Sequence, residues 1–143
     1  MGREIIVIES YRATVSAVDH GSPASRFSLN CYSADLEQRG IKYRYEVFLD
    51  APRNSYSLIY WLQGSGSLDR RIIAVLNMEP EQLDRAYLLL STEKPVRIRI
   101  EHDGGNLLDE DQNDGYRRVS EAKIYTGLEP VGEGEDAVEV FPE

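Results

Sequence analysis

Alternation of apolar and polar residues along the chain predicts a protein built mainly from β-strands. The clearest segment is 41–49, where apolar side chains alternate with polar ones and only Phe48 breaks the pattern. A strand or pair of strands is expected at 3–19, with a bulge or bend at Glu9 and Ser10. Further strands are expected at 27–31, 56–63, 71–77, 96–101 and 116–126.

Polar connections such as 35–40 separate the predicted strands. One segment, 79–92, has the period of a helix instead. Its apolar residues recur with the spacing of one helical face: Leu83, Ala86, Tyr87 and Leu90. Pro80 suits a first helical turn, and Pro95 lies beyond the end. The order of elements predicts an antiparallel barrel or sandwich of six to eight strands with one amphipathic helix. An oligonucleotide-binding-type barrel belongs to that set, although a fold alone does not establish a function.

The length and composition of the chain predict one domain followed by a tail. A chain of 143 residues, 41% hydrophobic and 29% charged, can bury one core but not two. From residue 127 onward the composition shifts to Gly, Pro, Val and acidic residues, with little apolar material to hold the segment in place. We therefore expect a single β-rich domain at 1–126 and an acidic, flexible C-terminal tail at 127–143.

Charge is distributed unevenly between the two parts of the chain. Residues 1–100 contain 13 Lys or Arg against 12 Asp or Glu, whereas residues 101–143 contain 3 against 13. Because no catalytic spacing accompanies this asymmetry, we expect a non-enzymatic, oligomeric module that engages a protein partner through its sheet surface and acidic C-terminal segment. Val138, Val140 and Phe141 are the candidate partner-binding residues there, since an apolar and acidic strand can add to a sheet edge.

Residues that often carry catalysis are sparse. His20 and His102 each follow or precede an aspartate, but adjacency in sequence does not make a triad, and we expect both in surface or turn positions. The only cysteine, Cys31, alternates with apolar neighbours and is expected in the core, and a lone cysteine excludes an intramolecular disulfide. Without a secretory signal or a long apolar run, the chain is expected to be cytoplasmic and not bound to a membrane.

A basic set of side chains supports a rival function. Its members project from several predicted strands: Lys42, Arg44, Arg70, Arg71, Arg97 and Arg99. Neighbouring strands would turn this set into a groove for single-stranded nucleic acid, and the acidic tail would then recruit other proteins. Tyr43 and Tyr45, however, lie on the face opposite Lys42 and Arg44, so one strand cannot present both sets to one ligand. A solvated outer face is favoured over the groove.

The acidic loop after His102 carries two further alternatives. Asp109, Asp111 and Asn113 resemble the alternating oxygen ligands of a calcium loop, although glycine and glutamate do not fall at the required positions in one register. A solvated turn is favoured, and no other cofactor is expected. Carboxylates held rigidly at 103–114 would instead imitate the charge of DNA and inhibit a DNA-binding protein.

Overall fold

The computed structural model describes residues 2–16, 26–50, 56–105, 107–108, 116–126 and 138–139. Within them the chain forms β1 (Gly2–Val7), β2 (Ser10–Ser16), β3 (Arg26–Tyr32), β4 (Leu36–Gln38), β5 (Ile41–Asp50), β6 (Leu58–Gln63), β7 (Arg70–Asn77), α1 (Pro80–Thr92), β8 (Val96–His102), β9 (Arg117–Thr126) and β10 (Val138–Glu139). One curled sheet has the order β1-β8-β9-β6-β7-β5-β3-β2, with β4 on β5 and β10 on β9. The prediction of a mainly β fold with one helix is confirmed.

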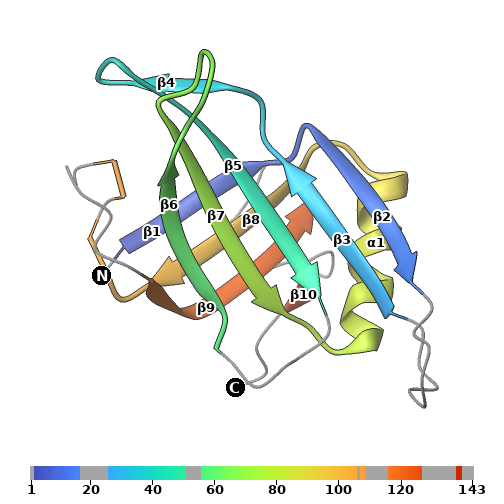
Figure 1. Ribbon diagram of the computed structural model, residues 1–143. Coiled ribbons are helices and arrows are strands. Elements are labelled where there is room, and N and C mark those ends of the chain that lie inside the picture. Colours follow the sequence, from blue (N-terminus) through green and yellow to red (C-terminus); the bar gives the residue numbers. More distant parts are fainter. Residues whose placement is uncertain are drawn as a thin grey trace.

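The sheet curls into a half-barrel. Figure 1 shows β6, β7, β5, β3 and β2 in a front layer, with β1, β8 and β9 crossing behind it. The two ends of the strand order, β1 and β2, are consecutive in the chain and meet at a bend. There the Ile8 N–H donates to the Val96 carbonyl at 2.9 Å, and the Glu9 N–H donates to the Tyr32 carbonyl at 2.7 Å. The bend predicted at Glu9 and Ser10 therefore lets one segment serve both edges of the sheet.

Two details of the sheet differ from the sequence-based expectation. β5 and β7 pair in parallel, because the chain leaves β5, forms β6 and then inserts β7 between them. Period-two alternation is the same in both orientations, so the sequence did not reveal this pair. The polar connection expected at 35–40 contains β4, which returns into β5 through Arg39 and Gly40 at φ 54° and 80°. Two consecutive positive φ angles are those of a tight hairpin turn.

The concave side of the half-barrel holds the core, which α1 completes. Leu83, Ala86 and Leu90 of the helix are buried together with inward-facing strand residues. The helix begins with a reciprocal capping box between Glu79 and Gln82. Cys31 is fully buried, as predicted, and burial raises the pKa of its thiol to about 12. In the described part of the chain, no helix has the length and apolar character required to cross a bilayer.

Candidate functional site on the outer face of the sheet

Strand β5 places successive side chains on opposite faces of the sheet. Tyr45 and Val47 point into the core, whereas Arg44, Glu46 and Phe48 point to the outer, convex face. Glu46 is nevertheless only 4% exposed. A carboxylate so well covered on an outer face requires partners that compensate for its loss of water.

Two arginines supply that compensation. Arg71 of β7 donates to Glu46 through Nε at 2.8 Å and through Nη2 at 2.9 Å, which is a bidentate contact. Arg44 of β5 itself adds a third hydrogen bond, from Nη2 to Oε2 at 3.0 Å. The parallel register makes this arrangement possible, because it sets Arg44 beside Arg71 and Glu46 beside Ile73. We refer to Arg44, Glu46 and Arg71 as the outer charged cluster.

The electrostatics of the cluster follow from these contacts. The hydrogen bond from Arg71 is the main reason that the pKa of Glu46 lies below its usual value, although burial acts in the opposite direction. The same hydrogen bond raises the pKa of Arg71. Glu46 is therefore ionised at neutral pH. Its two arginine side chains stay partly accessible, at 35% and 37% of their surface, so they can donate further hydrogen bonds to an incoming group.

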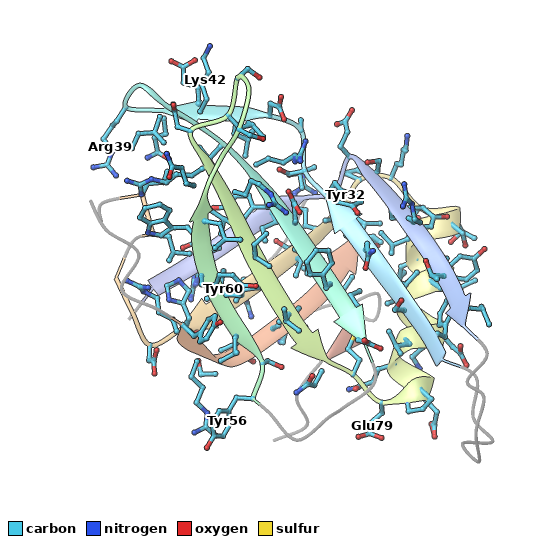
Figure 2. The ribbon with its side chains drawn as sticks, viewed as in Figure 1. Tyr32, Arg39, Lys42, Tyr56, Tyr60 and Glu79 are labelled. Carbon is cyan, nitrogen blue, oxygen red and sulfur yellow. The ribbon has the colours of Figure 1, made fainter. Side chains whose placement is uncertain are left out.

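Tyrosine rings flank the outer charged cluster on both sides. Tyr32 of β3 lies opposite Glu46, and Tyr60 of β6 lies opposite Ile73, so both share the outer face (Figure 2). The ring of Tyr116, which is 68% exposed, meets Tyr60 edge-on at 4.8 Å. Beyond it, the Arg118 guanidinium stacks over Tyr56 at 3.9 Å. These rings give the face large apolar contact area with polar hydroxyl groups at its surface.

Aliphatic side chains fill the spaces between the rings. The cross-strand register places Leu62 beside Arg71, and it aligns Leu58 and Val75 with Phe48. We call the whole surface the outer aromatic face, made of Tyr32, Arg44, Glu46, Phe48, Leu58, Tyr60, Leu62, Arg71, Ile73, Val75 and Tyr116. It extends over the four neighbouring strands β6, β7, β5 and β3, with Tyr116 before β9 at its margin.

The structure brings together only some of the six basic residues that the sequence offered as groove candidates. Arg44 and Arg71 share Glu46, but Arg70 turns to the other side of β7, where it stacks over Trp61 at 4.2 Å and donates to the Leu107 carbonyl at 2.6 Å. Arg97 and Arg99 belong to β8, in the other layer of the sheet. Lys42 precedes Arg44 by two residues on β5 and therefore lies on the same face of that strand. The six residues therefore point to several different surfaces.

Other predicted site residues lie largely outside the described part of the chain. Asp109, Asp111 and Asn113 are outside it, and the described residues contain no group of three potential metal ligands. Val138 lies in β10, whereas Val140 and Phe141 are outside the described residues. The proposed rigid carboxylate array at 103–114 falls mostly in the same gap.

A second polar cluster, inside the half-barrel, escaped the sequence analysis. Glu4 of β1 accepts a hydrogen bond from the Tyr45 hydroxyl at 2.5 Å, and its other oxygen lies 3.1 Å from His102 Nε2. The Gly104 N–H donates to His102 Nδ1 at 3.3 Å. With Nδ1 as the acceptor for Gly104, the Nε2–H of His102 points to Glu4. We call Glu4, Tyr45 and His102 the inner polar cluster.

Burial sets the chemistry of the inner polar cluster. His102 is 0% exposed, so the surface or turn position expected for it is wrong; the apolar alternation of β8 carries its side chain inward. Burial, followed by the nearby Glu4 charge, raises the pKa of the Tyr45 hydroxyl. His20 lies outside the described residues. The inner cluster joins a carboxylate, a phenol and an imidazole by mutual hydrogen bonds and links β1, β5 and β8.

Two shallow hollows in the described surface are smaller than typical ligand sites. One, of about 280 Å³, lies at the bend between β1 and β2, beside Glu93 and Lys94. The other, of about 270 Å³, lies between β4 and the β6–β7 turn. Small-molecule pockets usually have roughly 300 to 1,000 Å³, so neither hollow favours an enclosed small ligand.

Comparisons of the chain with protein-family models, with curated proteins and with solved structures found no match.

Proposed function

We propose that this protein is a non-enzymatic binding module that engages a protein partner through the outer aromatic face. The observation that carries the proposal is the composition of that face, where tyrosine and arginine side chains surround aliphatic ones on four paired strands. Tyrosine and arginine are the residues that protein interfaces favour and that contribute most of their binding energy. A platform of paired strands also limits the conformational entropy lost on binding.

The outer charged cluster specifies the chemistry of the partner. Arg44 and Arg71 share the carboxylate of Glu46, and each keeps about a third of its side chain accessible, at 35% and 37%. Asp35 approaches Arg44 only at 3.9 Å and is itself 61% exposed. A partner that places a carboxylate or carbonyl oxygen over the two guanidinium groups would satisfy the remaining donors. The partner we propose therefore has an apolar surface that contains an acidic side chain.

The acidic C-terminal segment belongs to the same proposal. Residues 101–143, which include this segment, contain 13 acidic and 3 basic residues, and this charge repels strongly acidic macromolecules at long range. The partner's acidic group is therefore local, within a surface that is not acidic overall. Long-range repulsion of this kind selects partners through the association rate.

A single-stranded nucleic acid remains the rival ligand. The structure supports it less, because a backbone of several phosphates needs basic side chains along one surface, whereas Arg70, Arg97 and Arg99 lie away from the outer charged cluster. The other basic side chains are dispersed over different surfaces. Nucleic-acid binding would depend steeply on salt concentration, which provides a way to recognise it.

A photo-crosslinking pair tests the proposal. Benzoylphenylalanine replaces Tyr116, which is 68% exposed at the outer aromatic face, or Val15, which is 69% exposed on the opposite face of β2. Irradiation in extract of the native host should give a discrete protein adduct from position 116 alone. Adding Arg71→Met should abolish that adduct.

Two results would contradict the proposal. Equal protein adducts from both positions would show that position 116 merely samples abundant proteins. Salt-sensitive retention of a labelled oligonucleotide, lost in the Arg71→Met variant, would assign the face to nucleic acid instead.

A further inference from the structure

Strand β9 has two edges with different neighbours. β8 pairs with β9 from Val119 to Thr126 and so occupies one edge over most of the strand. β6 reaches the other edge only at Arg117 and Arg118, and the last contact on this side is the Val119 N–H donated to the Ser57 carbonyl. Beyond that point β6 and β9 diverge. The second edge of β9 is therefore not covered by β6 from residue 120 onward.

The C-terminal strand β10 lies on this second edge. It pairs antiparallel with β9, with Val138 opposite Ile124 and Glu139 opposite Lys123 (Figure 1). Among the described residues this pairing comprises these two residues of each strand. β10 also contacts α1. Because a backbone hydrogen bond contributes a net ~1 kcal/mol, the described ladder of β10 contributes less than the ladders of six to eight residues within the sheet.

We propose that the second edge of β9, residues 120–125, is a strand-acceptor site that β10 occupies in the resting protein and that an extended segment of a partner protein can take over. An uncovered strand edge pairs with any extended chain of suitable pattern. The register defines that pattern as a β-branched apolar residue opposite Ile124, next to an acidic residue opposite Lys123. This site goes beyond the proposed function, because it uses no residue of the outer aromatic face.

The resident strand acts as a tethered competitor. A segment of the same chain competes at an effective concentration on the order of millimolar. Consider a free peptide that binds the open site with a dissociation constant of roughly 0.1 mM. Competition from the resident strand would weaken its binding to the intact protein about ten-fold. Release of β10 would regulate access to the site.

The experiment measures binding of a fluorescent peptide with the sequence of residues 135–143 to the full-length chain. In one variant, Val138→Pro and Glu139→Pro are combined, because adjacent strand residues direct their N–H groups to opposite sides and the pair removes whichever donor faces β9. Fluorescence anisotropy should show about ten-fold tighter peptide binding to this variant than to the wild type. The matched Val138→Ala and Glu139→Ala variant, which keeps both donors, should bind the peptide less tightly than the proline variant.

Register provides a second measurement that does not depend on the proline variant. A peptide with cysteine in place of Glu139 should form a disulfide with a Lys123→Cys chain, whereas a peptide with cysteine in place of Val140 should do so much less. The proposal would be overturned if the folded proline variant bound the peptide with the affinity of the wild type. Equal disulfide formation by the two cysteine peptides would also overturn it. A dimer of the wild type cross-linked through exchanged C-terminal strands would also overturn it, by assigning the site to a second copy. Tyr60→Ala should leave peptide binding unchanged, which separates this test from that of the proposed function.

Discussion

Two buried glutamates on opposite faces of the sheet have partners of different kinds. Glu46, on the outer face, accepts hydrogen bonds from two arginines whose side chains remain about a third accessible. Glu4, on the inner face, accepts hydrogen bonds from Tyr45 and from the fully buried His102. The outer cluster keeps donors for an incoming group, and the inner cluster uses its donors internally. The first arrangement suits recognition, and the second suits architecture.

The strands that each cluster joins reinforce this contrast. The outer charged cluster connects β5 and β7, which already pair with each other along eight residues. The inner polar cluster connects β5 to β1 and β8, which lie in the other layer of the half-barrel. At Gly2 a Cβ atom would clash with the His102 ring, so the close approach of β1 to this imidazole requires glycine there. Loss of the inner cluster should therefore affect folding more than loss of the outer one.

The largest expected effect follows from Glu4→Ala. The substitution leaves the Tyr45 hydroxyl and the His102 N–H buried without an acceptor, and each such group costs about 1 to 3 kcal/mol. We expect the free energy of unfolding in urea to fall by about 3 kcal/mol. The neighbouring Arg3→Ala removes an exposed ion pair with Glu101 and should cost less than about 0.5 kcal/mol. Similar losses in the two variants would remove the architectural role of the inner polar cluster.

The next effect concerns binding through the outer charged cluster. Arg71→Met keeps most of the apolar stem but removes the bidentate contact and the donors offered to a partner. We expect about 30-fold weaker affinity for the partner, or about 2 kcal/mol, as for other interface hot spots. Calorimetry with the cross-linked partner, once purified, measures this affinity. Arg85→Met, on the exposed face of α1, is the control and should bind normally; equal weakening in both variants would locate the interface elsewhere.

A smaller effect concerns the pH dependence of stability that the arginine partners of Glu46 produce. The pKa of Glu46 is lowered in the folded protein, mainly by Arg71, so the unfolded chain binds more protons in acid. Its contribution to stability is therefore present above the ordinary glutamate pKa of about 4.3 and is lost as the pH falls through the lower folded value. Between about pH 5 and about pH 3, the wild type should lose about 1 kcal/mol more stability than Glu46→Gln. Parallel stability curves for the two proteins would contradict this.

The alternation of residues in the sequence predicted which face of a strand a side chain lies on, but it did not predict which side chains of other strands it contacts. Alternation in β5 predicted that Tyr45 and Arg44 lie on opposite faces, and the structure confirms it. The contact between Arg71 and Glu46 depends on the parallel pairing of β5 with β7, which alternation cannot reveal. The contact between Glu4 and His102 joins residues 98 positions apart and depends on how the whole sheet curls. Local pattern therefore predicted most of the elements, although not β4, whereas both clusters required the topology.

The smallest expected effect lies at the rim of the outer aromatic face. The Arg118 guanidinium stacks over Tyr56, which is 58% exposed, and an exposed cation–π contact contributes about 0.5 to 1 kcal/mol. Arg118→Gln should lower the free energy of unfolding by no more than about 0.5 kcal/mol, because water replaces the lost contact. Partner affinity should change by less than about three-fold, since rim contacts contribute little compared with central ones. A loss as large as that of Arg71→Met would move the centre of the interface toward β9 and away from the outer charged cluster.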